Sequence, residues 1–178
     1  MSDSSTAGRG ARRNRLTIQQ LVTEHHQVLY RYAFRMTGNE SDAEDLTQQT
    51  YLIAQNKLNQ LRQPGAARSW LFRILRTTFL KSCRKRRPWT AVDLDMDMNA
   101  VVGQWPHTSP LDQERLQMAL DELPEMFKLV LLMFYFEDRS YQEIADELEV
   151  PLGTIMSRLS RAKAHLRKRL GPVETTKA

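Results

Sequence analysis

Residues 140–170 constrain the fold more than any other part of the chain. Their sequence is SYQEIADELEVPLGTIMSRLSRAKAHLRKRL. Ser140 followed three residues later by Glu143 is the pattern of a capping box, which predicts a helix beginning at Tyr141. Pro151 interrupts the apolar periodicity, and a second apolar stripe with helical spacing follows it. Two short amphipathic helices joined by a tight turn predict a helix-turn-helix.

The second of these helices is strongly basic. Residues 154–170 contain six Lys or Arg residues and no acid. Surface helices usually mix charges of both signs to gain i,i+4 pairs, so an ordinary solvated helix is the weaker interpretation. A helix with small and hydrogen-bonding side chains fits a major groove, and an arginine can reach base edges or phosphates. Such side chains lie opposite the apolar stripe: Ser157, Ser160, Arg161, Ala164 and Lys168.

This unit resembles region 4 of the extracytoplasmic-function sigma factors of bacterial RNA polymerase, which belong to group IV of the sigma-70 family. Glu149 departs from the family, which usually has glycine at the turn. Because glycine adopts a left-handed conformation at little cost and glutamate does not, we expect a strained or differently shaped turn. The resemblance implies that the helix-turn-helix, residues 141–161, and the basic turn after it read the −35 promoter element through Thr154, Ser157, Arg158, Ser160, Arg161, Lys163 and Lys168.

The overall composition is that of a soluble protein with an anionic partner. The 178 residues carry a net charge of +5, and mean hydropathy is −0.54. No run approaches the roughly 20 apolar residues of a membrane span. The basic first 15 residues lack the apolar stretch of a secretory signal and are expected to be disordered. The single cysteine, Cys83, excludes an internal disulfide and suits a reducing cytoplasm.

Three helices are predicted in the first half of the chain. The first spans about residues 17–37, has a Thr17–Gln20 capping box and ends at Gly38. The second spans about residues 42–58 after a capping box of Ser41 and Glu44, and the third spans about residues 66–86. The buried stripe of the first helix is predicted to contain Ile18, Leu21, Val22, Leu29, Tyr32, Ala33 and Met36.

The second helix has acids in its first turn. Interaction with the helix dipole is a sufficient structural reason for them, and an acidic docking edge is the functional alternative. Metal binding is a poorer interpretation, because oxygen cages need ligands from more than one turn. DAEDLTQQTYLIA resembles sigma region 2.2, which binds the clamp helices of the polymerase β′ subunit. The resemblance implies core contacts by Asp42, Asp45, Leu46, Gln48 and Gln49.

Residues 46–92 contain ten Lys or Arg residues and no acid. A charge run is usually a solvated face, but like charges repel in the free protein unless an anion such as phosphate is present. SWLFRILRTTFLKSCRKRR resembles regions 2.3 and 2.4, which open and read the −10 element, and residues 60–67 match the loop that captures an extruded base. The implied −10 contacts are Arg62, Arg68, Arg73, Arg76, Lys81, Arg84, Lys85, Arg86 and Arg87.

Aromatic residues of the third helix allow two interpretations. Trp70, on the apolar side, is expected to pack inward, whereas Phe72 is equally suited to packing and to stacking on bases. Thr78 is also predicted to face inward. It departs from the family, as does Lys81, because relatives commonly have Asn and Asp at these positions.

The second half of the chain begins after a segment without sustained period. Residues 111–150 carry eleven acids against three bases, and a helix starting at Pro124 is apolar all round, which places it at the centre of a domain. The sequence predicts an all-α fold of two small helical domains joined by a flexible linker. Residues 1–15 form a disordered arm, 16–88 a three-to-four-helix bundle (region 2), 89–110 the linker, 111–171 the helix-turn-helix domain (region 4), and 172–178 a tail.

The resemblance covers about residues 17–170 and implies a promoter-specificity subunit. Its expected partners are the β′ clamp helices and β flap of polymerase core, promoter DNA and an anti-sigma protein. We expect it in the bacterial cytoplasm with the nucleoid, without membrane insertion, cofactor, metal or catalytic residue. A stand-alone helix-turn-helix regulator explains the C-terminal unit equally well, but not the acidic and acid-free helices before it. The sequence gives almost no support for an enzyme, because phosphate-binding glycine loops, metal-ligand clusters and nucleophile motifs are missing.

Overall fold

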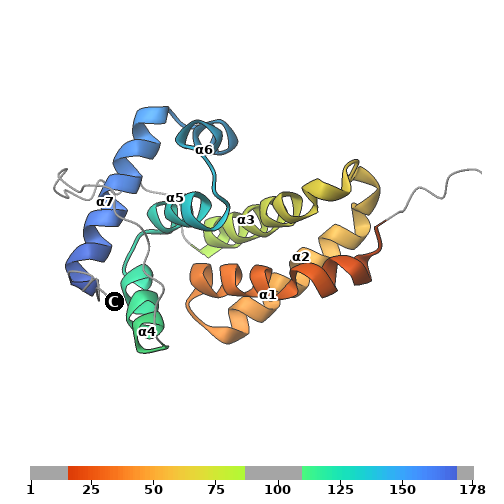
Figure 1. The fold of residues 1–178 in the computed structure, drawn as a ribbon, viewed down its shortest axis with the longest axis horizontal. Coiled ribbons are helices and arrows are strands. Elements are labelled where there is room, and N and C mark those ends of the chain that lie inside the picture. The colour runs from red at the N-terminus through yellow and green to blue at the C-terminus, as the bar shows by residue number, and fades with distance from the viewer. Residues whose placement is uncertain (1–15, 87–109, 172–178) are drawn as a thin grey trace, which may run out of the picture.

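The computed structural model describes residues 16–86 and 110–171, with the side chains of residues 84–86 and 110–112 excepted. The predicted basic arm, most of the linker and the tail therefore lie outside the described residues, as does Arg87. Over the described ranges the chain forms α-helices and two 3₁₀ turns, with no strand (Figure 1). This confirms the predicted all-α class.

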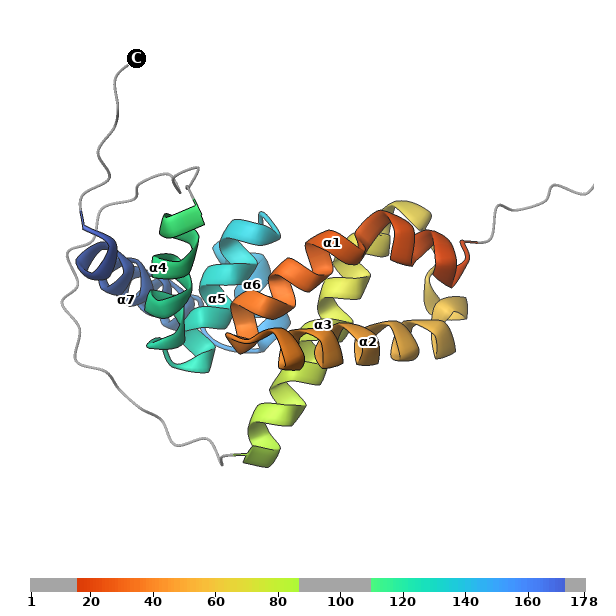
Figure 2. The same cartoon turned by 90° about the horizontal axis from the view of Figure 1, so that it is seen from below.

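The N-terminal unit, residues 16–86, consists of three long helices. Helices α1 (Ile18–Thr37) and α2 (Glu40–Asn56) lie side by side, and α3 (Ala67–Arg86) packs against both of them (Figure 2). Two 3₁₀ turns, η1 (Leu58–Gln60) and η2 (Pro64–Ala66), connect α2 to α3. The Thr17–Gln20 capping box forms as predicted, and Gly38 ends α1 with a φ of 82°.

The start of α2 differs from the prediction. Its N-cap is Asn39, whose side-chain oxygen accepts a hydrogen bond from the backbone N–H of Asp42 at 2.8 Å. Ser41 lies one residue inside the helix, so the predicted capping box of Ser41 and Glu44 is wrong. Asparagine caps a helix as well as serine does, and it follows directly on the left-handed Gly38 that ends α1. The chain therefore turns between the two helices within two residues.

The C-terminal unit, residues 110–171, surrounds one apolar helix. It contains α4 (Pro110–Asp121), α5 (Glu125–Phe136), α6 (Tyr141–Leu148) and α7 (Leu152–Leu170). Helix α5 contacts α6 and α7 within the unit and also α1 of the N-terminal unit. As predicted, α5 lies at the centre, and its buried residues include Phe127, Leu129, Val130, Leu131, Leu132 and Met133.

The two units pack directly on each other through aromatic side chains. The ring of Tyr32 on α1 lies 4.8 Å from the ring of Phe72 on α3 and 5.8 Å from that of Phe136 on α5. Phe72 is only 1% exposed, which decides between its two interpretations in favour of packing, while Trp70 and Thr78 are half-buried. The buried face of α3 is thus rotated from the predicted one, because the C-terminal unit covers part of it.

The turn of the helix-turn-helix is left-handed. The Ser140–Glu143 capping box starts α6, and α6 ends at Glu149 with φ 55° and ψ 43°. This confirms the strain expected from glutamate at this position. On α7 the apolar stripe is buried at Ile155, Leu159, Ala162 and Leu166, while Leu152 at the start of the helix is 40% exposed. On α1, Val22, which was predicted to be buried, is 37% exposed.

Replacing Gly38 with alanine tests the junction between α1 and α2. A Cβ at Gly38 would lie 2.7 Å from Oδ1 of Asp121, in a residue whose φ is +82°. We expect Gly38→Ala to lower the free energy of unfolding by about 1–2 kcal/mol, measured by urea denaturation. Gly65→Ala is the matched control, since a Cβ there meets no atom within 4 Å. Equal effects of both substitutions would contradict this account.

Replacing Glu149 with glycine tests the turn. Glycine removes the strain of the left-handed conformation, which stabilises the fold, but it also raises the conformational entropy of the unfolded chain, which destabilises it. The expected net increase in the free energy of unfolding is about 0.5–1 kcal/mol. Thermal and urea unfolding would measure it. Glu149→Ala, which keeps a Cβ, should give no such gain; a gain of equal size would point to loss of charge instead.

Candidate polymerase and nucleic-acid interfaces

The outer face of α2 presents the residues predicted to bind polymerase core. Asp45, Gln48 and Gln49 are exposed, and Asp42 is half-buried. Leu46 is 6% exposed and belongs to the hydrophobic core, so in this arrangement its side chain faces inward. The helix brings the three exposed residues onto one stripe, because they are separated by three and four positions.

Leu52 extends this stripe and was not predicted. Its side chain is 60% exposed, seven residues after Asp45 and therefore on the same side of α2. The sequence already indicated that Leu52 is exposed, because its helical spacing places it on the polar stripe of α2 and not on the buried one. An exposed leucine beside polar and acidic neighbours is typical of a protein-binding face.

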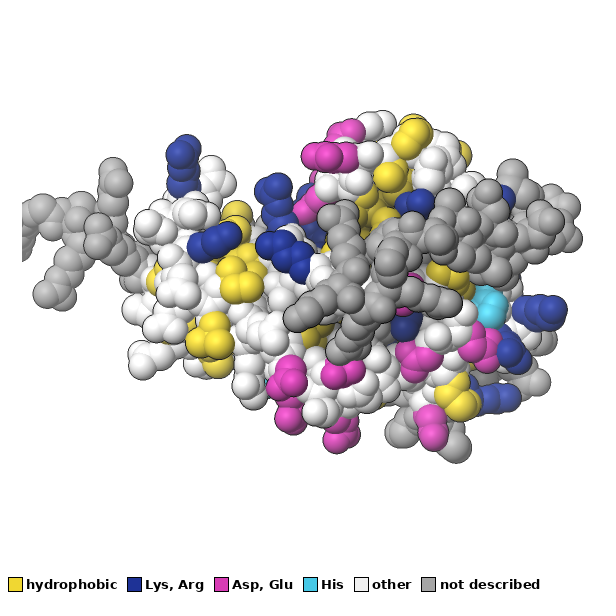
Figure 3. Space-filling view, turned by 180° about the vertical axis from the view of Figure 1, so that it is seen from behind, with side chains coloured by type: hydrophobic (Ala, Val, Ile, Leu, Met, Phe, Trp, Pro, Cys, Tyr) yellow, Lys and Arg dark blue, Asp and Glu magenta, His cyan; other side chains and the backbone are white. Residues whose placement is uncertain are grey.

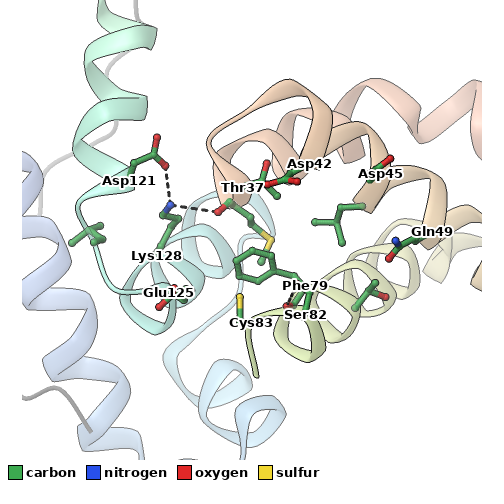
Figure 4. Close-up of a pocket in the computed structure, with 14 residues that line it drawn as sticks. Thr37, Asp42, Asp45, Gln49, Phe79, Ser82, Cys83, Asp121, Glu125 and Lys128 are labelled. Atoms are coloured by element: carbon green, nitrogen blue, oxygen red, sulfur yellow. Dashed lines mark hydrogen bonds and ion pairs between the residues drawn. The ribbon is translucent and has the colours of Figure 1, made fainter. Parts of the chain in front are cut away.

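A cavity of about 360 Å³ separates the edge of α2 from the C-terminal unit (Figure 4). Asp42, Asp45 and Gln49 line it together with residues of α3 that include Cys83. Across the cavity, Nζ of Lys128 donates to Oδ1 of Asp121 at 2.9 Å and to the backbone carbonyl of Met36 at 3.4 Å. Lys128 thus joins α5 to the end of α1.

The basic residues of α3 and its preceding loop divide into exposed and engaged groups. Arg62, Arg68, Arg73 and Lys81 are exposed. Arg68 donates to the carbonyl of Phe136 at 3.1 Å and its guanidinium lies 5.5 Å from the centre of the Phe72 ring. The side chains of Arg84, Lys85 and Arg86 lie outside the described residues.

Arg76 is buried between the two units. Its side chain is 3% exposed and forms ion pairs with Glu137, which is 2% exposed, and with Glu147. The Tyr32 hydroxyl donates to Glu137 at 2.8 Å. Burial by itself lowers the pKa of the guanidinium, but Tyr32, Glu137 and Glu147 outweigh it and raise that pKa. Burial, followed by the Glu137 charge, raises the pKa of Tyr32 well above its usual value, so the hydroxyl stays protonated.

Sequence reasoning assigned Arg76 to DNA and did not anticipate these partners. The two glutamates follow Arg76 by 61 and 71 residues, and no local spacing connects them to it. In the arrangement described here the guanidinium is therefore not available to phosphate.

The predicted −35 residues of α7 lie at different depths. Lys168 is exposed, and Thr154, Ser157, Ser160 and Arg161 are half-buried. Met156, 51% exposed, adds an apolar group to the outer face. Arg158 is also half-buried, and burial lowers the pKa of its guanidinium. Nη1 of Arg158 and Nε of Arg161 are buried without a hydrogen-bond partner in this arrangement.

Lys163 faces the interior of the C-terminal unit. It is 8% exposed, and its Nζ lies 4.7 Å from the ring centre of Phe134 and 5.6 Å from that of Tyr135. Burial, followed by the charge of Arg167, lowers the pKa of Lys163. In this structure the lysine stabilises the packing of α7 on α5 through cation–π contact rather than presenting its ammonium to DNA.

The described residues contain no group of three or more His, Cys, Asp or Glu side chains placed to hold a metal ion. Among the described helices, none has the length and apolar character needed to cross a membrane.

Comparisons with known proteins match both units. Residues 21–88 match the family described as Sigma-70 region 2, and residues 113–166 match Sigma-70, region 4. The sigma factor SigV of Bacillus subtilis is 32% identical, over 84% of this chain and 88% of its own length. The ECF sigma factor SigE of Mycolicibacterium smegmatis is 38% identical over 83% of this chain, which spans 59% of that relative.

Solved structures show the same fold. The sigma factor RpoE of Bartonella quintana, in complex with the anti-sigma factor NepR, superposes with a TM-score of 0.65 at 26% identity, covering 85% of this chain and 95% of that one. CnrH, in complex with the cytosolic domain of CnrY, gives a TM-score of 0.56 at 24% identity and covers 85% of each chain. Taken with the two family matches in the predicted order, these likenesses show that the chain belongs to the extracytoplasmic-function sigma factors of RNA polymerase.

Proposed function

We propose that this chain binds RNA polymerase core through the exposed stripe of α2 and directs initiation at promoters by contacting their −10 and −35 elements. The observation that carries the proposal is the combination of two surfaces of opposite charge in one chain. An acidic and polar stripe lies on α2, and basic side chains lie on α3 and α7. A stand-alone DNA-binding regulator needs only the basic side chains.

The α2 stripe is suited to a protein partner. Asp45, Gln48 and Gln49 offer charge and hydrogen bonds, and Leu52 offers apolar area at the same face. This mixture resembles a standard interface, in which an apolar contact is surrounded by polar groups. By family resemblance the partner is the pair of clamp helices of β′, and α7 with its unit also contacts the β flap.

The DNA contacts divide between the two units. Exposed Arg62, Arg73 and Lys81 supply positive charge for the −10 strand, whose phosphates dominate affinity. On α7, Arg161 is half-buried, and serines at positions 157 and 160 offer short hydrogen-bonding side chains beside it. These groups are suited to base edges and phosphates in the major groove.

Regulation and location follow from the family. RpoE was solved in complex with the anti-sigma factor NepR, and we expect an anti-sigma protein for this chain too. Its action belongs in the cytoplasm at the nucleoid, where core and promoters are found, and it contributes no catalytic group of its own. A stand-alone regulator is not favoured, because it leaves the region 2 match over residues 21–88 without a role.

Replacing Arg161 with alanine tests the −35 contact. We expect loss of about 1–3 kcal/mol of promoter discrimination, which corresponds to roughly a tenfold or greater fall in run-off transcription from a −35-dependent promoter. Core binding, measured by co-purification, should be unchanged. Arg115→Ala, at an exposed site on α4, is the control and should leave transcription intact. Equal loss of core binding and transcription in Arg161→Ala would contradict the division of roles.

Replacing Asp45 and Gln49 together with alanine tests the core contact. The double variant should lose most of its association with core polymerase and, with it, transcription, because the polar rim of the stripe is removed. Binding of the free protein to promoter DNA should not fall. Glu24→Ala removes an exposed acid from α1 as a matched control. If the unsubstituted chain neither co-purifies with core nor initiates transcription with it, the proposed function is wrong.

A further inference from the structure

Two large apolar side chains are exposed at the start of α7. Leu152 is 40% exposed and Met156 is 51% exposed. They are four positions apart and therefore lie on the same side of the helix, one turn after the other. Packing in the core does not account for them, because the face of α7 that packs inward is formed by Ile155, Leu159 and Leu166. We call Leu152 and Met156 the apolar ridge.

The apolar ridge runs onto the outer face of α7. Residues four positions apart form a ridge along an α-helix, and the next two members of this one are Ser160 and Ala164. Both are half-buried, and both have small side chains. None of the four side chains carries a charge or an amide group. A molecule that meets the beginning of this ridge therefore meets mainly hydrocarbon.

The charges that follow the apolar ridge favour DNA as its partner. Residues 150–170 contain six Lys or Arg residues and no acid, and the first of these bases, Arg158, comes two positions after Met156. In Figure 3 hydrophobic side chains reach the surface at the upper end of the C-terminal unit, where α7 begins, and Lys and Arg side chains gather toward its lower end. A duplex suits this order, because it offers base edges inside the groove and phosphates along the rim.

Gly153 is a second, independent indication of a ligand at the start of α7. Its φ is not positive, and a Cβ at this position would meet no atom within 4 Å, so neither backbone conformation nor internal packing requires glycine. Glycine is also a poorer helix former than alanine. A glycine does allow another chain to approach the backbone closely. The smooth first turn beside Leu152 thus fits a helix that enters a groove between two sugar–phosphate strands.

The major groove contains one apolar group that such side chains can recognise. Every base pair presents hydrogen-bonding atoms there, and among the unmodified bases only thymine adds a C5-methyl group. In a helix-turn-helix the N-terminal residues of the second helix contact the base edges, and Leu152 and Met156 lie in the first two turns of α7. Against any other base edge they would remove water from polar atoms without replacing the lost hydrogen bonds, which is unfavourable.

We propose that the apolar ridge reads the C5-methyl groups of pyrimidines in the −35 element. The inference rests on the proposed function and names the feature of the bases that α7 selects. Leu152 and Met156 are about 6 Å apart along the helix axis, which is close to two base-pair steps of about 3.4 Å. The −35 element therefore contains one or two nearby thymines whose methyl groups are needed. The same contact favours 5-methylcytosine over cytosine.

Uracil scanning of a cognate promoter tests the contact. Run-off transcription with core polymerase on genomic DNA maps start sites and supplies the promoter. Each thymidine of its −35 element is then replaced in turn with deoxyuridine, which removes only the methyl group. With the unsubstituted full-length chain, the initiation rate at limiting holoenzyme should fall about fourfold at one or two positions. With Met156→Ala the ratio of the thymine rate to the uracil rate should approach one at the position that Met156 contacts, and Leu152→Ala should do the same at a neighbouring thymine.

Met118→Ala is the matched control, because Met118 is 56% exposed but lies on α4. Its thymine-to-uracil ratios should equal those of the unsubstituted chain. Met156→Leu keeps an apolar side chain and should retain most of the ratio.

A second series of templates adds the methyl group back on a different base. Replacing a uracil-sensitive T·A pair with C·G should lower the initiation rate of the unsubstituted chain. Placing 5-methylcytosine there should raise the rate about fourfold above that with cytosine. Met156→Ala should show no such gain at its own position.

The outcomes separate this inference from the proposed function. If the chain initiates with core but no uracil in the −35 element lowers the rate, the apolar ridge does not read methyl groups and the sigma-factor function stands. The same holds if Met156→Ala and Leu152→Ala keep the ratios of the unsubstituted chain. Loss of co-purification with core in Met156→Ala would place this side chain in a protein interface and overturn the inference. If the unsubstituted chain initiates nothing with core, the proposed function is wrong and the inference falls with it.

Discussion

Burial of α5 holds the described chain together. This helix is apolar on all sides and contacts α6 and α7 in its own unit and α1 in the other. Leu129, Val130 and Leu131 are fully buried, and each such side chain contributes about 1.5–3 kcal/mol relative to exposure. Every binding surface is placed relative to this helix, since α7 packs on one side of it and α1 on another.

Polar groups fix the orientation in which the two units pack around this apolar helix. Arg76, Glu137 and the Tyr32 hydroxyl lie beside the aromatic contact of Tyr32 with Phe136. Hydrophobic area alone would allow many orientations of the C-terminal unit. The charged and hydrogen-bonded groups restrict them, because misalignment would leave an uncompensated charge buried.

Local features of the fold could be predicted from the sequence, because they depend on neighbours within one helical turn. The capping boxes at Thr17 and Ser140, the Gly38 cap and the left-handed Glu149 are of this kind. The errors arise where two local signals compete or where distant segments meet. Asn39 caps α2 in place of Ser41, since both residue types are good caps two positions apart.

The residues of each candidate site could be predicted from the sequence, but the side chains that pair with them could not. The family resemblance assigned Asp45, Gln48 and Gln49 to a binding face of α2, where they are exposed. It could not foresee that Arg76 would be enclosed by acids more than sixty residues later, or that Lys163 would lie over Phe134. Periodicity assigns a residue to a side of its own helix, and only the fold determines what covers that side.

The exposed side chain of Leu52 has an energetic consequence for any molecule that covers it. With 60% of its surface in water, its complete burial releases about 1–2 kcal/mol. That amount strengthens an association by roughly an order of magnitude. Since a hydrocarbon has no charge to be screened, this share of the affinity would survive in concentrated salt, where contacts made by the acidic neighbours weaken.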